Sequence, residues 1–385
     1  MRKAFVIGAC LCAMAGLLGG CTGKYEEAVV TNAETLADTG EDAAITIIQE
    51  TTEPEPETEA EAEASAGGIL NLSDRTPTDG KVRSYLTGEW VDEAIGNRRP
   101  IATMMSNDKA ALPQYGINRA GVVYEANVEG TMNRYMSIIE DYDDLERIGS
   151  TRSCRTYYTY FAREFDAIYS HYGQSTFAVP YLKNVDNING IEGIGATAFY
   201  RSNDKKAPHN AYTSGDRLKK AIEKLGYSTE YNADYRGHYQ FADGEYSLDG
   251  SQGVMEAIKV VPGYAMNKAM FVYQADDGLY HRYQYGDIHQ GNEGPITAKN
   301  LIIQYCQTGR YATTEYLNIN VHTSGENGYF FTNGKGIPIT WEKDGEFGVT
   351  HYYGPDGKEI ILNQGQTWVC IVNALDKSKI EIYGE

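Results

Sequence analysis

The sequence predicts an α+β protein in which a mixed α/β unit is followed by a smaller, mostly antiparallel β unit. Two observations predict this order. Between about residues 99 and 226, short apolar runs typical of strands alternate with two segments of helical periodicity. From about residue 264 onward, short β runs follow one another and are separated by Gly, Asn and Asp turns.

The composition divides the chain into four segments. We expect them to be a signal peptide (1–20), a disordered acidic linker (21–80), an N-terminal α/β domain (81–263) and a C-terminal β-rich domain (264–385). The 385 residues leave enough chain after the first two segments for a sizeable hydrophobic core.

The first half contains both kinds of regular element. A helix is expected over residues 152–165, and its apolar face carries Tyr157, Tyr158, Phe161 and Phe165. A second helix is expected over 214–225, opened by Thr213 or Ser214 as the cap and closed by Gly226. Apolar runs predict strands at the following positions: 101–106, 121–129, 132–140 and 167–171.

The second half consists of short strands. Residues 270–274 and 279–285 flank Asp276, Asp277 and Gly278, a pattern typical of a hairpin. Residues 317–322 alternate strictly, so that one face is expected in the core and the other in solvent. Further strands are expected at 329–332, 337–341, 359–362, 367–372 and 380–383.

The first 21 residues have the pattern of an export signal. Two basic residues, Arg2 and Lys3, precede an apolar core over 4–18 and the sequence Gly19-Gly20-Cys21. This resembles a bacterial lipobox, which implies cleavage before Cys21 and attachment of membrane lipid to its sulfur. An ordinary signal peptide that happens to contain a Cys, or an uncleaved anchor, is the alternative. We therefore expect a cell-membrane location, lipid-anchored on the extracytoplasmic face.

The segment after Cys21 is rich in Glu, Ala, Thr and Pro and has few aromatic residues. Such a composition cannot bury enough apolar surface to offset the entropy of ordering. About 55 flexible residues span roughly 40 Å. The whole chain has a formal net charge of −19 and no segment dense in Lys or Arg, so nucleic acid is excluded as an expected partner.

Three cysteines fall in the mature body: Cys154, Cys306 and Cys370. An odd number cannot form a complete disulfide framework. Cys306 and Cys370 lie in strand-like apolar runs, so small buried side chains are the first interpretation, and a bond between these two is the alternative.

The densest cluster of chemically active residues is at 149–155. Cations at a helix start oppose the positive end of the helix dipole, so Arg152 and Arg155 need a negative partner. Two partners are possible. Glu125 and Glu129 could pair with the arginines internally, or a phosphate or carboxylate ligand could bind there.

Cys154, His171 and His209 are candidates for catalysis. Cys154 lies between two arginines, which would lower its thiol pKa, but no Cys-His-Asn framework accompanies it, so packing is the favoured interpretation. Each histidine could act as a general acid or base, or serve as a hydrogen-bonded structural residue. His281, Asp287 and His289 lack the rest of a zinc motif, so we predict no metal and no cofactor.

Several segments in the right order resemble the YerB-like lipoproteins, a family of exported bacterial proteins. These segments are 99–102 with Asn107, 121–125, Glu129 and Gly130 with Arg134, 149–155, 171–173, 199–201, 206–212, 297–301 and 365–369. The resemblance implies a two-part folded region and no assigned catalytic activity. It also implies motif positions at Glu125, Glu129, Arg134, Arg152, Arg155, His171, Lys206, His209 and Asn210. Cys154 stands where similar proteins commonly have a small residue such as Ala.

The leading functional hypothesis is a membrane-anchored lipoprotein that binds an envelope component, a cell-wall ligand or a protein partner. The expected site is a polar cleft formed by these nine motif positions. A hydrolase or transferase acting on cell-wall material, with His171 or His209 as the base, is the alternative. A third possibility is an ion-paired core with function carried by tyrosines of the β unit, since the chain holds 31 Tyr against 10 Phe.

Overall fold

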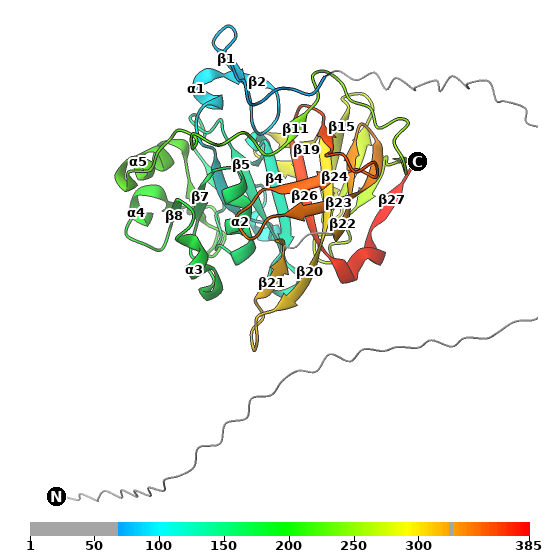
Figure 1. The fold of residues 1–385 in the computed structure, drawn as a ribbon. Helices are drawn as coiled ribbons and strands as arrows, with labels where there is room; N and C mark the ends of the chain where they lie inside the picture. Colours follow the sequence, from blue (N-terminus) through cyan, green and yellow to red (C-terminus); the bar gives the residue numbers. More distant parts are fainter. Residues whose placement is uncertain (1–67, 323–325) are drawn as a thin grey trace, which may run out of the picture. The chain divides into compact units, whose positions relative to one another are not determined.

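The computed structural model describes residues 68–322 and 326–385 (Figure 1). They belong to one compact unit that spans residues 60–385. The expected signal peptide, the lipidation site Cys21 and most of the expected acidic linker lie outside the described residues. Within the described residues, no helix is long and apolar enough to cross a membrane.

A twelve-stranded mixed sheet forms the centre of the molecule. Ten of its strands follow one path, in the order β12-β23-β22-β20-β26-β4-β5-β3-β7-β8, while β21 pairs with β20 and β24 with β23. The strands are β3 (Ile101–Ser106), β4 (Val122–Asn127), β5 (Asn133–Ile139), β7 (Ile168–His171), β8 (Asn187–Asn189), β12 (Met255–Glu256), β20 (Asn300–Arg310), β21 (Leu317–Asn320), β22 (Glu326–Thr332), β23 (Lys335–Lys343), β24 (Thr350–Tyr353) and β26 (Thr367–Asn373).

The central sheet is built from both halves of the chain. Strand β26, close to the C-terminus, lies between β20 and β4 and is parallel to both. Figure 1 shows β26 beside β4 in the middle of the molecule. The sheet therefore continues across residue 263, where we expected one domain to end and the next to begin.

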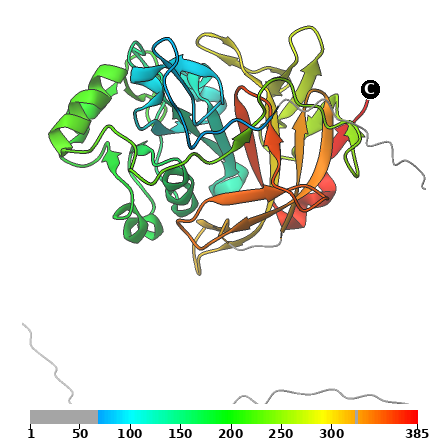
Figure 2. The same cartoon turned by 45° about the horizontal axis from the view of Figure 1, so that its top comes forward.

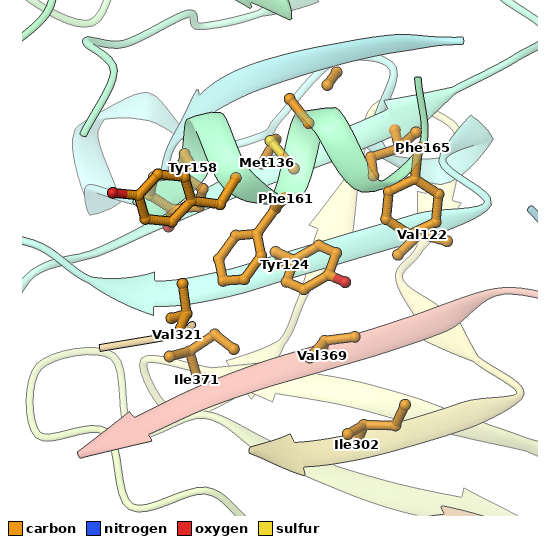
Figure 3. Close-up of a cluster of buried hydrophobic side chains, with 14 of the residues drawn as sticks. Val122, Tyr124, Met136, Tyr158, Phe161, Phe165, Ile302, Val321, Val369 and Ile371 are labelled. Atoms are coloured by element: carbon orange, nitrogen blue, oxygen red, sulfur yellow. The ribbon is translucent and has the colours of Figure 1, made fainter. Parts of the chain in front are cut away.

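One face of the sheet is covered by helix α2 (Thr156–Glu164). Phe161 of the helix stacks on Tyr124 of β4, with ring centroids 4.1 Å apart (Figure 3). Val369 and Ile371 of β26 belong to the same buried cluster, and so does Ile302 of β20. Because this helix contacts strands from both halves, the core does not divide at the expected boundary either.

The other face packs against a smaller antiparallel sheet and helix α5 (Gly215–Leu225). Trp368 of β26 meets Phe271 of the smaller sheet, with ring centroids 5.7 Å apart. In Figure 2 helix α5 lies on the opposite side of the molecule from β22–β24. The smaller sheet contains β13 (Lys259–Val261), β14 (Met270–Gln274), β15 (Leu279–Gln284), β16 (Asp287–Ile288), β19 (Thr297–Ala298) and β27 (Glu381–Tyr383).

These observations confirm the predicted α+β class. Helix α5 begins and ends where the sequence indicates: Ser214 accepts a hydrogen bond from the backbone N–H of Arg217, and Gly226 closes the helix with φ of 68°. Helix α2 begins at Thr156, four residues later than expected. Residues before it are extended, since Thr151 forms a bridge with Met105 and Cys154 with Gln174.

Short elements complete the fold. The first folded residues come before residue 81, because the backbone N–H of Leu70 donates to the carbonyl of Phe241 (2.8 Å) and Leu72 is buried. The remaining strands are β1 (Lys81–Arg83), β2 (Trp90–Asp92), β6 (Ile148–Gly149), β9 (Tyr200–Arg201), β10 (Ala211–Thr213), β11 (Gln240–Phe241), β17 (Gln290–Gly291), β18 (Gly294–Pro295) and β25 (Ile361–Leu362). The remaining helices are α1 (Glu93–Gly96), α3 (Val179–Leu182), α4 (Gly195–Ala198) and the 3₁₀ helices η1 (Lys109–Ala111), η2 (Ile117–Arg119), η3 (Glu129–Thr131), η4 (Thr176–Ala178) and η5 (Ala374–Lys379).

Candidate functional site

Polar residues gather at one edge of the central sheet. Strands β3 and β7 are parallel, and β5 is antiparallel to both β3 and β4. The carboxyl ends of β3, β4 and β7 therefore meet at this edge, at Ser106, Asn127 and His171, and β5 starts there. In open sheets with parallel strands, ligands commonly bind at this edge.

The chain leading into α2 runs along the same edge. The backbone N–H of Ser106 donates to the carbonyl of Ser150 (2.9 Å), and that of Arg152 donates to the carbonyl of Met104 (3.0 Å). This pairing brings Arg152 and Arg155 next to Arg134, the second residue of β5. We call these three arginines the basic cluster.

Arg155 has an internal partner. Its guanidinium forms a two-point ion pair with Glu129, in which Nη2 lies 2.7 Å from Oε2 and Nε donates to Oε1. Burial acts to raise the pKa of Glu129, but the hydrogen bonds and charge of Arg155 outweigh it, so this pKa is lowered. The expected pairing of Arg155 with Glu129 is present.

Arg134 has no carboxylate partner in the part of the chain that the structure describes. Its side chain is 5% exposed, and its Nη1 donates to the backbone carbonyl of Ser153 (2.7 Å). Burial, followed by repulsion from Arg155 and Arg152, lowers the pKa of Arg134 to about 10. A buried cation beside two others is costly unless an anion compensates it.

Arg152 is likewise without an ion pair among the described residues. Its Nη1 donates to the carbonyl of Pro208 (3.0 Å), which brings the arginine close to His209. Burial and the charge of Arg155 lower the pKa of Arg152. Glu129 thus compensates one arginine of the basic cluster, and the cluster as a whole keeps an excess of positive charge.

His209 lies beside this excess charge. Its Nδ1 is 3.3 Å from Oγ of Ser106, and its Nε2 is 3.8 Å from Oδ1 of Asp108. Burial lowers the pKa of His209; Asp108 raises it, and Arg152 lowers it further. A neutral imidazole beside a guanidinium can donate or accept a hydrogen bond from a ligand.

Three buried polar side chains, at the end of β3 and in the chain that leads into α2, lack hydrogen-bond partners among the described residues. Both amide atoms of Asn107 are in this state, and so are the hydroxyls of Ser150 and Thr151. Native proteins rarely leave such groups unsatisfied, because each costs about 1–3 kcal/mol. Thr151 pairs with Met105, which faces the smaller sheet, so its hydroxyl lies on the face opposite Arg134. The hydroxyl of Ser150, the preceding residue, is on the Arg134 face, where a polar ligand could satisfy it.

Glu125 lies elsewhere, which corrects the expectation that it pairs with Arg152 or Arg155. Side chains alternate along a strand. Tyr124 and Ala126 of β4 face α2, so Glu125 faces the smaller sheet, whereas Arg134 faces α2.

On that opposite face, Glu125 is fully buried and pairs with Arg282 of β15. Arg282 Nη2 lies 3.0 and 2.9 Å from the two carboxylate oxygens. The other donors to this carboxylate are Asn133 (2.7 Å), Asn267 (2.9 Å) and Trp368 (3.1 Å). We call this group the sealed network.

His171 has a structural position. It is fully buried, and its two ring nitrogens lie 2.8 Å from the carbonyl of Gly173 and 3.2 Å from Oδ1 of Asn187. Burial lowers its pKa. Of the two other motif positions, Asn210 bonds Arg201 (2.6 Å) and the carbonyl of Ser202 (3.2 Å), and Lys206 is exposed. The structure thus brings together Arg134, Arg152, Arg155, Glu129 and His209, but not Glu125.

The three described cysteines are buried and free. Burial raises the pKa of Cys154 to about 12, so its thiol is protonated at neutral pH. This agrees with the packing interpretation of Cys154. Cys306 and Cys370 do not form the disulfide that the sequence left open.

The site offers little for acid–base or metal chemistry. Glu125 and Glu129 are held by Arg282 and Arg155, and their described hydrogen bonds include none to a histidine. Among residues 68–322 and 326–385, no three His, Cys, Asp or Glu side chains come together as metal ligands would. The arrangement is suited to holding an anion.

Ser106, Asp108 and Arg282 belong to these groups but were not predicted from the sequence. Ser106 ends a predicted apolar strand and Asp108 closely follows it, which was an available signal because parallel strand ends meet at one edge. Arg282 gave no such signal, since it lies in a hairpin strand far from Glu125 in the chain.

The chain matches two family models, described as the N-terminal and C-terminal domains of a protein of unknown function (DUF3048), over residues 86–228 and 258–369. A relative from Bacillus subtilis (strain 168), named "Putative lipoprotein YerB", is 29% identical over 308 residues, which is 78% of this chain and 89% of the relative. The crystal structure of YerB from Bacillus subtilis gives a TM-score of 0.67 at 28% identity and covers 78% of this chain and 99% of that one.

Proposed function

The chain belongs to the YerB-like lipoprotein family, and on that premise we propose that it is a membrane-anchored extracytoplasmic protein that binds an anionic envelope component. Lipid attached to Cys21 holds it at the membrane surface, and the basic cluster receives a carboxylate or phosphate of the ligand. His209 provides a further polar contact.

One observation carries the proposal: Arg134 is buried beside two other arginines and pairs with no carboxylate in the described chain. A guanidinium in this position is unfavourable in the free protein. A bound anion would remove the repulsion among the three cations and form charge-assisted hydrogen bonds with them. The unsatisfied hydroxyl of Ser150, on the same face of the sheet, supports a polar ligand at this place.

A hydrolase or transferase is the weaker alternative. It would need a base beside an oriented carboxylate, whereas Asp108 remains 3.8 Å from His209, and Glu129 and Glu125 bind arginines. Binding requires only the charge and donors described above.

The test is calorimetric titration of the full-length protein in detergent with two probes, a muropeptide carrying free carboxylates and a glycerol phosphate oligomer. The two probes separate the carboxylate and phosphate sources. We expect the affinity for the probes to fall as the salt concentration rises. We also expect Arg134→Gln and Arg152→Gln each to lower this affinity by about tenfold or more.

Arg310→Gln is the matched control, because Arg310 is an exposed arginine paired only with exposed Glu315 in the described chain. The affinity of the Arg310→Gln variant for both probes should equal that of the unchanged protein. Equal affinities for Arg134→Gln and the unchanged protein, or no binding of either probe, would contradict the proposal.

A further inference from the structure

A groove lined by tyrosines lies on the central sheet at β20, β22, β23 and β24. Its volume is about 430 Å³, and Tyr305, Tyr329 and Tyr353 are among its lining residues. We call it the tyrosine groove. Protein sites for small ligands commonly have about 300–1,000 Å³.

Strand register places these side chains on one face. Tyr329 is paired with Ile303, the residue two before Tyr305, and Tyr353 is paired with Thr340. Thr340 is in turn paired with Asn327, two residues before Tyr329. Since cross-strand partners share a face, all three rings lie on the same side of the sheet.

The three rings lie on the face of the central sheet that elsewhere packs against the smaller sheet and α5, in a second hydrophobic core. Ile303 and Phe331 are buried in that core, whereas Tyr329 and Tyr353 are only half-buried. The neighbouring residues Phe330, Trp341 and Tyr352 point to the opposite face and are buried there. Tyr329 and Tyr353 are therefore not needed to fill either core completely and remain partly accessible, whereas Tyr305 is 5% exposed and belongs to the core on this face.

The lining combines aromatic rings with neutral polar groups. Asn327 and Thr340 provide an amide and a hydroxyl, and Lys377 provides the one charged group among the lining residues. The Lys377 ammonium lies 4.8 Å from the ring centroid of Tyr305 and 4.0 Å from a carboxylate oxygen of Glu326 outside the groove. No carboxylate belongs to the described lining.

We propose that the tyrosine groove binds a saccharide chain that carries carboxylate groups. Sugar rings present apolar C–H faces that pack on aromatic rings, and hydroxyls that bond to amides and hydroxyls. The single ammonium in an otherwise uncharged groove complements a sugar carboxylate. The groove is independent of the basic cluster, since the two share no lining residue.

The experiment measures binding of two tetrasaccharides to the full-length protein in detergent by calorimetry. One is a neutral tetramer of β-1,4-linked N-acetylglucosamine; in the other, alternate sugars carry a lactyl carboxylate. We expect both to bind, the carboxylated one more tightly. Because the neutral tetramer has no anionic group, its binding cannot come from the basic cluster, so this test is separate from that of the proposed function.

Four variants locate the binding. Tyr329→Ala and Tyr353→Ala should each weaken both tetrasaccharides by about tenfold, through loss of ring contacts. Lys377→Ala should remove the preference for the carboxylated tetramer and leave the neutral one nearly unchanged. Tyr329→Phe should keep most of the affinity, which separates ring contact from loss of folding.

Tyr383→Ala is the matched control. Tyr383 is also an exposed tyrosine with a lysine over its ring, since Lys259 Nζ lies 4.4 Å from the centroid, but it belongs to the smaller sheet. The affinity of the Tyr383→Ala variant for both tetrasaccharides should equal that of the unchanged protein. The proposal is overturned if neither tetrasaccharide binds, if Tyr329→Ala binds as well as the unchanged protein, or if a ten-residue polyproline peptide binds the groove in their place.

Discussion

The sealed network and the basic cluster are built from the same residue types but differ in how their charges are balanced. In the sealed network, one carboxylate, Glu125, receives four different donors and pairs with one guanidinium, Arg282. In the basic cluster, three guanidiniums share one close carboxylate, that of Glu129. The comparison teaches that a buried arginine indicates a ligand only when its own chain leaves it uncompensated.

The environments of the two groups support this distinction. Burial lowers the pKa of Arg282, but Glu125 and neighbouring groups outweigh burial, so its pKa is raised. The pKa of Arg134 is lowered to about 10, because burial and two like charges act together. The protein thus stabilises the charge of one arginine and destabilises that of the other.

The largest expected effect is in the sealed network. Arg282→Met leaves Glu125 buried without its guanidinium, and we expect the free energy of unfolding to fall by about 3–5 kcal/mol. Urea unfolding followed by circular dichroism measures this. Arg310→Met, at an exposed site, is the control and should change it by less than about 0.5 kcal/mol. If Arg282→Met lost less than about 1 kcal/mol, the sealed network would be no more sensitive to loss of an arginine than the basic cluster, which would contradict this comparison.

The second effect concerns Glu140, a buried carboxyl that pairs with no cation side chain in the described chain. Burial raises its pKa from 4.5 to about 7, against a hydrogen bond from Ser84 (2.6 Å) that lowers it. Between pH 4.5 and about pH 7, the Glu140 carboxyl keeps its proton in the folded protein but has lost it in the unfolded chain. Stability is therefore greatest below pH 4.5 for this group, and about 3 kcal/mol is lost as pH rises through 7.

The measurement for Glu140 is the free energy of unfolding in urea at pH 5 and pH 8. We expect the difference between Glu140→Gln and the unchanged protein to shift in favour of the variant at pH 8. A difference that does not depend on pH would show that an unpaired buried charge costs little in this fold, which would also weaken the interpretation of Arg134.

The third effect is in the basic cluster, at its compensated member. Arg155→Gln removes the partner of Glu129, which is 19% exposed, and we expect a loss of about 1–2 kcal/mol at pH 7. The pKa of Glu129 is lowered in the folded state, so its contribution is present above its unfolded pKa and disappears as pH falls through the folded one. The destabilisation of Arg155→Gln should therefore shrink in acid; equal losses at pH 7 and pH 3 would contradict the pairing.

The smallest effect is expected for Arg134. Arg134→Met replaces an uncompensated buried guanidinium with an apolar side chain of similar length, and the stability should change by less than about 1 kcal/mol in either direction. The loss of its hydrogen bond to Ser153 is offset by relief of repulsion from Arg152 and Arg155. Thermal unfolding without ligand measures this, and a loss of 3 kcal/mol or more would make Arg134 a structural residue.

Local features of the fold could be predicted from the sequence. The caps at Ser214 and Gly226 follow from backbone geometry that few residues satisfy, and the hairpin of β14 and β15 follows from its turn. Arg152 and Arg155 were singled out because cations at a helix start are unfavourable, although Arg152 lies in the extended chain before α2, and Arg134 was implied by the family resemblance. Each of these features depends on interactions between residues that are close in the chain.

Long-range features could not be predicted in this way. Nothing in the sequence near residues 367–372 indicates that this strand lies between β20 and β4. To predict the partner of Glu125, one would need to know which face of β4 Glu125 occupies and which strand packs against that face. The tyrosine groove required the register of four strands, although the abundance of tyrosine had indicated a Tyr-bearing face of the β unit as a possibility.

The central place of β26 has a consequence for biosynthesis. If the proposed export carries the chain across the membrane unfolded, β4 and β20 cannot meet their shared neighbour until nearly the last residues have emerged. We expect the N-terminal part to stay loosely structured during secretion and the whole sheet to close in one late step. A nascent chain halted before residue 367 should accordingly remain open to proteases along its entire body.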